Sequence, residues 1–377
     1  MQTSPQEIAS PAPAAPQRAW DTNTLLVWLG SRIGIVIAMT AGVAILGGDE
    51  AKTPFLERWL HWDAGLLVEI AKFGYDGDPA EKPDPGLPAF FPGMPIALRL
   101  VHLIVPDWSL AGLLISFAAG AVAVLALARL ADFEGPPGAG WRAALALILF
   151  PMAVFLFAGY SEPLFLAFAI PAWLYARRQD WSAAALLAAG ASCMRITGLF
   201  LALALIVEFV TQRRRLREAW WLAVPFLPLV AYSAYQHQRT GDWLAWQHAQ
   251  EAGWGRRMVW PWESFQTTLQ MASGDGQFVW AFRMEVAGAL LGVAVLVWLL
   301  LARRWSEFVY VGLQVGALLF SAYYLSIPRS ALLWWPVWVL LGRASARRPW
   351  LLLLYAVVVG PLMVMNVYGF MRGAWAG

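Results

Sequence analysis

One acidic residue lies in a setting where a carboxylate could do chemistry. Asp63 follows His61 and Trp62 and precedes an apolar run in the stretch 59-WLHWDAGLLVEIAKFGYDG-77. Apolar residues recur there at spacings of three and four, which predicts an amphipathic helix with Asp63 near its start. Such a carboxylate is most often a solvated residue or one that interacts with the helix dipole. It could also act as a general base toward an acceptor hydroxyl, so Asp63 is a candidate catalytic residue.

Three further charged residues interrupt apolar runs. They are Glu162 in FAGYSEPLF, Arg195 in GASCMRITGLF and Arg329 in LSIPRSALLWWP. Charged groups at membrane depth are costly and are functional candidates by default. Glu162 could instead cap a turn beside Pro163, and the arginines could mark outer loops or the headgroup layer. As functional groups, the arginines would suit a phosphate on a lipid-linked sugar.

The segment 236–265 is dense in Trp, His, Gln and Arg. Its tryptophans are Trp243, Trp246, Trp254, Trp260 and Trp262. Indole rings favour the membrane–water interface, and they also provide flat apolar faces for stacking on sugar rings. Both interpretations fit this segment. His248, Arg256 and Arg257 could contact phosphate or sugar hydroxyls.

Metal and nucleotide sites have little support in the sequence. The triplet 76-DGD-78 resembles an Asp-x-Asp metal site, but aspartates around a glycine before Pro79 more often form a turn. The single cysteine, Cys193, excludes an internal disulfide and a cysteine-based metal site. No His/Glu spacing indicates zinc, and no Gly-rich loop before a helix indicates a nucleotide. We therefore predict no cofactor and no metal ligands.

The composition is that of a polytopic membrane protein. Of 377 residues, 60% are hydrophobic and only 14% are charged, against about 45–50% and about 25% in ordinary globular chains. The net charge of +3 does not indicate nucleic-acid binding, because the arginines are spread over short loops between apolar spans. We expect the lipid bilayer as a partner and no nucleic acid.

Apolar runs predict an all-α fold with about eleven transmembrane helices, since a span needs about 20 residues. The predicted spans are 24–46, 108–130, 143–158, 160–176, 181–195, 197–211, 219–236, 280–301, 307–326, 331–342 and 350–369. Residues 1–22 are rich in Pro, Ala, Ser and Gln and predict a disordered cytoplasmic tail. The remainder, 23–377, is expected to form one transmembrane domain.

The basic clusters give an orientation through the positive-inside rule. They fall on one side if the N-terminus is cytoplasmic, which places the two large loops, 47–107 and 237–279, outside. Within the first loop we expect interfacial helices at 54–74 and 89–106. Asp63 and the other charged candidates then share the outer side, which predicts one extracytoplasmic site.

Several segments, taken together and in order, resemble the PIG-V family (GPI mannosyltransferase 2) and its bacterial relatives. The segments are 61-HWDAGLLVEIAKFGY-75, 89-AFFPGMPIALRL-100, 159-GYSEPLF-165 and 194-MRITGL-199, with 241-GDWLAW-246 and 328-PRSALLWWP-336 similar to bacterial members. The resemblance covers most of the chain from about residue 55 to about residue 340. Met94, Pro163 and Ile196 depart from the family pattern.

The resemblance implies a GT-C fold and a mannosyltransferase. Such an enzyme takes mannose from a polyprenyl-phosphate carrier and gives it to an extracytoplasmic glycan or glycolipid acceptor. Asp63 matches the position of the family's acidic base, with inversion at the sugar. Glu162 and Arg195 would line the cavity and Arg329 would lie near the donor phosphate. We include His61, Trp62, His248, Arg256 and Arg257 among the substrate-binding candidates.

Two other classes of function remain open from the sequence. A transporter or flippase of lipid-linked sugars would also contain broken helices and intramembrane charges. Transporters often consist of two similar halves, and we find no convincing internal repeat here. A structural subunit of a membrane complex would lack a polar cavity lined by Asp63.

Overall fold

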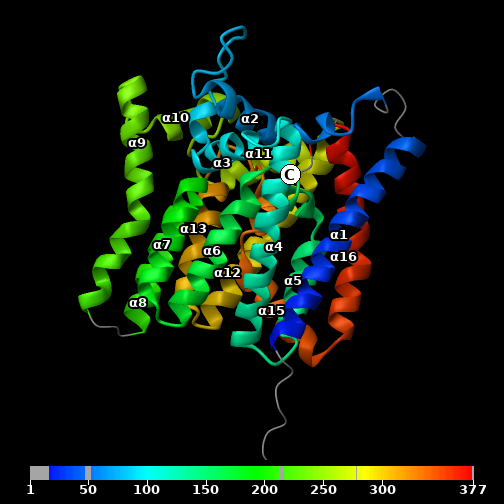
Figure 1. The fold of residues 1–377 in the computed structure, drawn as a ribbon, viewed down its shortest axis with the longest axis vertical. Coiled ribbons are helices and arrows are strands. Elements are labelled where there is room, and N and C mark those ends of the chain that lie inside the picture. The colour runs from blue at the N-terminus through cyan, green and yellow to red at the C-terminus, as the bar shows by residue number, and fades with distance from the viewer. Residues whose placement is uncertain (1–16, 47–51, 213–215, 277, 376–377) are drawn as a thin grey trace, which may run out of the picture.

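The computed structural model describes residues 17–46, 52–212, 216–276 and 278–375, and this part of the chain is mainly helical, with no strand (Figure 1). The α-helices are α1 (Gln17–Leu46), α2 (Asp63–Phe73), α3 (Gly93–His102), α4 (Trp108–Glu134), α5 (Ala139–Leu149), α6 (Ser161–Arg177), α7 (Trp181–Met194), α8 (Thr197–Thr211), α9 (Leu227–Thr240), α10 (Ala245–Trp254), α11 (Pro261–Ser273), α12 (Val279–Leu301), α13 (Trp305–Leu319), α14 (Ile327–Ala331), α15 (Trp335–Arg347) and α16 (Trp350–Met371). The 3₁₀-helices are η2 (Glu57–Trp59), η3 (Leu87–Ala89), η4 (Pro151–Leu156) and η5 (Leu216–Phe226).

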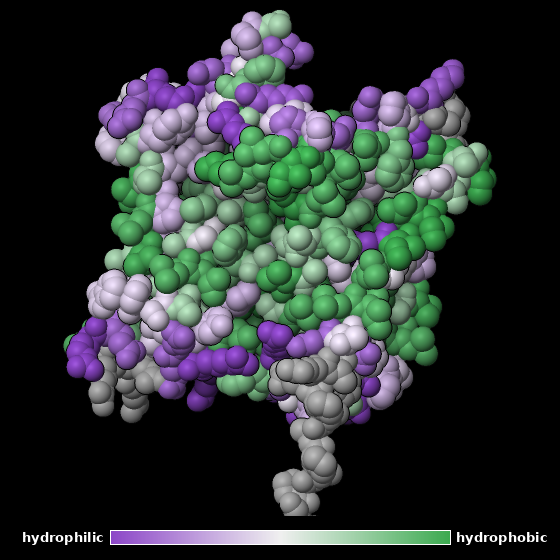
Figure 2. All heavy atoms as spheres, viewed as in Figure 1, coloured by the Kyte–Doolittle hydropathy of each residue, from purple (hydrophilic) through white to green (hydrophobic). Residues whose placement is uncertain are grey.

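The described helices make this a multi-pass membrane protein. Four of them, α1, α4, α12 and α16, are long and apolar enough to cross a bilayer, and α5, α7 and α8 are shorter apolar helices. Figure 2 shows, on the face in view, a band of hydrophobic residues across the middle of the molecule, between two hydrophilic ends. That pattern is expected of a protein surrounded by lipid. The short helices α2, α3 and α10 lie together at one of the hydrophilic ends (Figure 1).

Several predicted spans coincide with helices, two are divided at or near a proline, and the span 307–326 ends early because α13 stops at Leu319. The predicted span 143–158 is divided into α5 and η4, because Pro151 has no N–H to continue the helix. The span 219–236 is divided into η5 and α9 near Pro225. The N-terminal tail prediction falls on residues 1–16, which lie outside the described residues, and on the first turns of α1.

The prediction of one continuous helix over 54–74 is wrong. The chain forms η2, breaks at Trp62 with φ of 55°, and begins α2 at Asp63. In one helix Trp59 and Asp63 would share a face, because residues four apart are neighbours. The break separates them: Trp59 is 1% exposed and packs on Phe157, whereas Asp63 turns toward the pocket described below.

Two further predictions differ from the structure. The loop predicted at 237–279 contains α10 and α11, which are both amphipathic. The predicted span 331–342 is replaced by α14 and α15, with Leu332–Trp334 between them. These short elements matter because they carry pocket residues.

Small residues allow the central helices to pack closely. A Cβ on Gly112 of α4 would lie 3.2 Å from the Cα of Gly159, so the two backbones meet almost directly. Gly159 has φ of 75°, a conformation that residues with a side chain rarely adopt. The turn at Gly159 leads into α6 and thereby sets the direction of Ser161 and Glu162.

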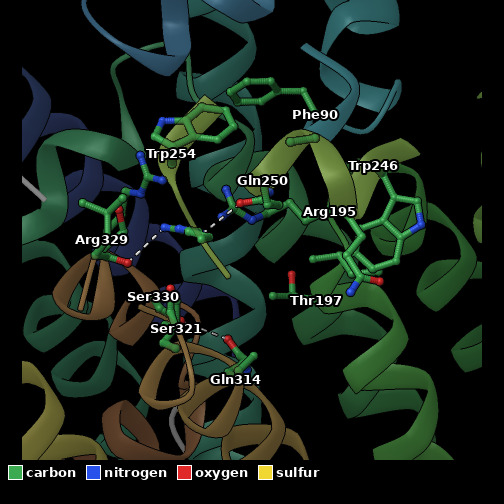
Figure 3. A pocket seen from close by; sticks show the side chains of 18 of the residues that line it. Phe90, Arg195, Thr197, Trp246, Gln250, Trp254, Gln314, Ser321, Arg329 and Ser330 are labelled. Atoms are coloured by element: carbon green, nitrogen blue, oxygen red, sulfur yellow. Dashed lines mark hydrogen bonds between the residues drawn. The ribbon is translucent and has the colours of Figure 1, made fainter. Parts of the chain in front are cut away.

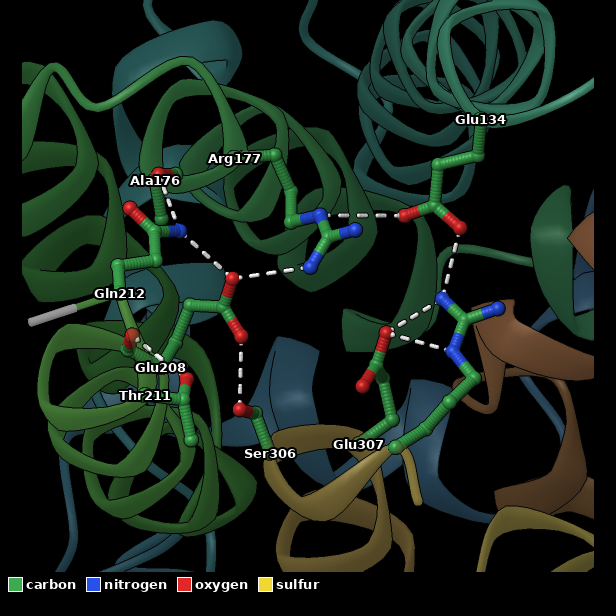
Figure 4. Close-up of polar contacts among 9 residues, drawn as sticks. Glu134, Ala176, Arg177, Glu208, Thr211, Gln212, Ser306 and Glu307 are labelled. Carbon is green, nitrogen blue, oxygen red and sulfur yellow. Dashed lines mark hydrogen bonds and ion pairs between the residues drawn. The ribbon is translucent and has the colours of Figure 1, made fainter. Parts of the chain in front are cut away.

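A network of ion pairs joins four helices at their ends away from the pocket (Figure 4). Arg304 pairs with Glu134 at 2.7 Å and also contacts Glu307. Arg177 pairs with Glu208 at 3.0 Å, and Ser306 donates a hydrogen bond to the same carboxylate at 2.7 Å. The charges are therefore partnered where they are buried, which offsets the cost of removing them from water.

Candidate active site

A pocket of about 440 Å³ lies at the end of the bundle that carries α2, α3 and α10. Its wall is assembled from segments far apart in the chain. They are the start of α2, the residues after η3, the α7–α8 junction, α10 with the loop after it, the end of α13, and α14 with the residues before it. Most of these segments are helix ends or breaks, where side chains and backbone groups are free to face a ligand.

Four charged side chains form a continuous chain of ion pairs at this pocket. Arg329 donates from Nη1 to Oδ2 of Asp63 at 2.8 Å, and its Nε lies 3.4 Å from Oε1 of Glu162. Arg195 lies 2.7 Å from the same Glu162 oxygen through Nη1, which also donates to Ser161 at 2.8 Å. The structure thus brings together the four charged residues that the sequence singled out in separate segments.

The inner part of this chain is withdrawn from solvent. The side chain of Glu162 is 1% exposed, that of Arg329 is 9% exposed and that of Asp63 is 14% exposed. Arg329 also lies over the rings of Phe155 and Tyr160, at 5.4 and 5.6 Å from the ring centroids. Buried and partnered on several sides, Arg329 holds Asp63 in one orientation.

The position of Arg329 depends on a residue that the sequence reasoning missed. Glu285 of α12 is 1% exposed and accepts hydrogen bonds from the backbone N–H groups of Ser326 and Ile327, at 2.6 and 2.8 Å. These groups begin α14, a five-residue helix that is too short to be stable alone. The sequence does contain a signal for Glu285, because an ionisable residue inside an apolar span is a functional candidate.

Asp63 is positioned from the other side by the turn before α2. The hydroxyl of Tyr160 donates to the carbonyl of His61 at 3.0 Å, which ties this turn to the start of α6. A Cβ on Gly65 would lie 2.9 Å from the carbonyl oxygen of Leu60, so the glycine lets the chain fold back tightly there. Asp63 and Glu162 are therefore held by two segments that are bonded to each other.

Two further arginines line the pocket without an acidic partner. Arg256 donates to the amide oxygen of Gln250 at 3.2 Å and to the carbonyl of Leu325 at 3.0 Å, both neutral groups. Burial lowers the pKa of Arg256 to about 10, so it remains protonated at neutral pH. Arg257 is exposed, and its side chain has no ion pair with any described residue. The four arginines outnumber the nearby carboxylates, which gives the pocket a net positive charge.

One face of α10 adds aromatic and amide groups. Trp246, Gln250 and Trp254 are spaced by four residues, so they share a face of the helix, and all three line the pocket (Figure 3). Phe90 faces Trp254 from the first loop, with ring centroids 5.6 Å apart. From the sequence, the tryptophans fit both an interfacial belt and a binding site. Gln250 and Phe90 are not among the predicted site residues.

Four of the predicted substrate-binding residues do not line the pocket: His61, Trp62, Glu162 and His248. Glu162 is buried and pairs with Arg195 and Arg329 instead. His61 packs edge-on against Phe370 with centroids 5.8 Å apart, and Trp62 packs against Trp375 at 5.1 Å. His248 is on the exposed face of α10 and lies 2.6 Å from Asp242. By contrast, the predicted residues that line the pocket are Asp63, Arg195, Arg256, Arg257 and Arg329.

The aspartates of the DGD triplet are placed as the turn interpretation expects. Asp78 accepts a hydrogen bond from the backbone N–H of Ala80 at 2.8 Å, and Asp76 forms an ion pair with Arg239. Within the described residues, no group of three or more His, Cys, Asp or Glu side chains is arranged to hold a metal ion. The functional groups that line the pocket are thus the carboxylate of Asp63, four guanidinium groups and several hydroxyls and amides.

Comparison with known proteins gives one family match, to part of the chain. A search of curated proteins found no match to this chain. Residues 48–219 match the family model described as mannosyltransferase (PIG-V). The matched segment contains Asp63, Glu162 and Arg195, while Arg329 and α10 lie beyond it. The ordered motifs of the sequence and this match agree: over residues 48–219 the chain is similar to the PIG-V mannosyltransferase family.

Proposed function

We propose that this membrane mannosyltransferase transfers mannose from a polyprenyl-phosphate-mannose donor to an extracytoplasmic glycan or glycolipid acceptor, with inversion and with Asp63 as general base. The observation that carries the proposal is the arrangement around Asp63. Arg329 engages one carboxylate oxygen, Oδ2, while Oδ1 has no hydrogen-bond partner among the described residues. That second oxygen is available to accept the proton of an acceptor hydroxyl.

The reaction balances without a cofactor. The acceptor hydroxyl gives its proton to Asp63, and its oxygen attacks the anomeric carbon from the face opposite the phosphate. The bond between that carbon and the phosphate oxygen breaks, and the electron pair leaves with the polyprenyl phosphate. The phosphate gains a negative charge at this step, so guanidinium groups placed beside it stabilise the transition state more than the ground state.

Arg256 and Arg257 are the best-placed groups for the phosphate. Arg195 and Arg329 already share Asp63 and Glu162, whereas the partners of Arg256 are neutral and Arg257 is exposed. An anion that enters the pocket therefore meets two cations that are not already neutralised. This assignment supports a phosphate-linked donor, and it requires no divalent metal.

The apolar side of the pocket suits the isoprenoid part of the donor. It is lined by Ile196, Leu199 and Phe200 from the start of α8 and by Leu318 and Phe320 from the end of α13. α8 and α13 pack against each other along the bundle. We assign this side to the carrier lipid and the aromatic face of α10 to the acceptor. We further propose that the chain has the GT-C fold with about eleven spans, counting the short helices, and that the pocket faces outward.

The substitution Asp63→Asn tests the proposal. Asparagine keeps the size of the side chain and a hydrogen bond to Arg329 but is a far weaker base. We expect the rate of mannose transfer to fall at least about a hundredfold, the usual contribution of general base catalysis, with donor binding retained. The control is Asp76→Asn, in the same loop but 88% exposed. The assay measures mannosylated product by mass after incubation with the donor and a membrane extract. Transfer by Asp63→Asn at near the wild-type rate would exclude Asp63 as the base.

A further inference from the structure

The pocket contains buried hydroxyl groups whose hydrogen bonds are not made within the protein. Thr197, Ser321 and Ser326 line it, and their residues are 8%, 7% and 6% exposed. Their hydroxyl oxygens have no hydrogen-bond partner among the described residues. A buried hydroxyl without a partner costs free energy, so each such group in a folded protein needs an explanation.

Local geometry explains why these hydroxyls lack partners. Elsewhere in the chain, helical serines and threonines donate to a carbonyl one turn earlier, as Thr240 does to Gln236 at 2.8 Å. Thr197 begins α8 and Ser326 precedes α14, so neither has a preceding turn of its own helix to bond with. Ser321 lies just beyond the end of α13, and its hydroxyl does not bond back to that helix. Three helix breaks have been brought to one pocket, and each of them contributes a free hydroxyl.

Two of these hydroxyls, those of Thr197 and Ser321, belong to the polar part of the pocket that lies lower in Figure 3. Figure 3 shows Thr197, Ser321, Ser330 and Gln314 below Arg195 and Arg329, on the side away from Trp254 and Phe90. Ser330 donates to the amide oxygen of Gln314 at 3.5 Å, and the amide nitrogen of Gln314 donates to the carbonyl of Tyr310 at 3.2 Å. This half is therefore uncharged but rich in groups that both donate and accept hydrogen bonds.

The hydrogen-bonding groups of this half of the pocket match one part of the proposed donor, its sugar. A lipid tail would leave the hydroxyls unpaired, and a phosphate is better matched by the arginines above. A sugar ring carries several hydroxyls that donate and accept, which is what rotatable Ser and Thr hydroxyls complement. Resting on the function proposed above, we propose that Thr197, Ser321 and Ser326 bind the sugar of the lipid-linked donor and distinguish it from the sugar-free carrier.

The test compares two ligands that differ only by the sugar. Dissociation constants are measured for polyprenyl phosphate mannose and for polyprenyl phosphate, with the wild-type protein and with the double variant Thr197→Val, Ser321→Ala. We expect affinity for the mannosylated donor to fall about tenfold or more, because buried polar groups of the sugar are left unpaired. Affinity for polyprenyl phosphate should be unchanged. The single variants should show smaller changes in the same direction.

Stability without ligand separates a binding role from a structural one. Removing a hydroxyl that has no partner should leave the ligand-free thermal stability unchanged or raise it. Ser116→Ala is the matched control, since Ser116 is fully buried in α4 and also unpartnered among the described residues, but does not line the pocket. It should alter neither dissociation constant.

Three results would overturn the inference. If the double variant binds both ligands as the wild type does, the hydroxyls do not bind the sugar, while the proposed function stands. A double variant that loses stability and keeps its preference for the mannosylated donor has the same meaning. If the wild-type protein binds neither ligand, the proposed donor is wrong and this assignment falls with it.

Discussion

Glu162 is shared by two arginines, and the charge balance of the pocket depends on it. Its carboxylate lies 2.7 Å from Arg195 and 3.4 Å from Arg329 and is almost fully buried. Arg329 has Asp63 as a second acidic partner, but the only acidic partner of Arg195 among the described residues is Glu162. Loss of the Glu162 charge therefore leaves Arg195 near Arg329 with no carboxylate between the two guanidinium groups.

We expect Glu162→Gln to lower stability by about 3 kcal/mol, the lower end of the cost of removing one partner from a buried ion pair, because Arg195 is partly exposed. In detergent, the apparent Tm should fall by roughly 5–10 °C. The control is Glu263→Gln on the exposed face of α11, which should change stability by less than about 0.5 kcal/mol. A variant as stable as the wild type would show that the charge of Glu162 is not needed to hold the arginines.

At the level of single residues, the sequence predicted the charged centre of the pocket and missed its neutral parts. Asp63, Glu162, Arg195 and Arg329 stand out because ionised groups are costly next to apolar spans. Thr197 and Gln250 give no such signal, since polar uncharged residues are tolerated in many places. His248 was included because it lies in the same segment as Arg256, but α10 turns it to the opposite face.

Among the elements, α14 is the one whose position decides where Arg329 points. α12 holds it in two places: Glu285 accepts from its first backbone N–H groups, and Gly288 leaves room for Pro328. A Cβ at Gly288 would lie 3.1 Å from the ring of Pro328, so the two elements are in direct contact. Contacts with α12 therefore fix the position of the five-residue helix α14.

The variant Glu285→Gln should weaken this hold, because an amide offers one good acceptor where two N–H groups need one each. We expect transfer to fall about tenfold, which corresponds to the loss of one hydrogen bond to a charged group, with a further fall for Glu285→Ala. Since Glu285 acts through Arg329 and Asp63, kcat should decrease and the affinity for polyprenyl phosphate should change little. A decrease in protein stability with kcat unchanged would show that Glu285 only supports the fold.

The sequence predicts long elements better than short ones, for a physical reason. α4, α12 and α16 are single long apolar runs, and their predicted bounds agree closely with the structure. The breaks at Trp62 and between α14 and α15 arise from tertiary contacts: Trp59 is drawn into the core and α14 is held by α12. Periodicity within a segment contains no information about such contacts.

On the scale of the whole molecule, the pocket and the ion-pair network drawn in Figure 4 lie at opposite ends of the same helices. α6 has Glu162 in its first turn and ends with Arg177, and α8 begins with Thr197 and has Glu208 near its end. At 1.5 Å per residue, the two ends of α6 are about 22 Å apart. The network fixes one end of each helix, so ligand-induced movement is expected mainly at the pocket end.

The same helices also bear on the orientation of the protein, which rests on the positive-inside rule. If the pocket faces outward, the loop before η3 is extracytoplasmic and the end of α15 is cytoplasmic. Lys82 and Arg348 are exposed on these two segments. We expect Lys82→Cys, in a Cys193→Ala background, to react in intact cells with a maleimide that cannot cross the membrane. Arg348→Cys should react only after the membrane is opened. The reverse pattern would place the pocket in the cytoplasm, where the charged donor would have to be used before it crosses the bilayer, and would contradict transfer to an extracytoplasmic acceptor.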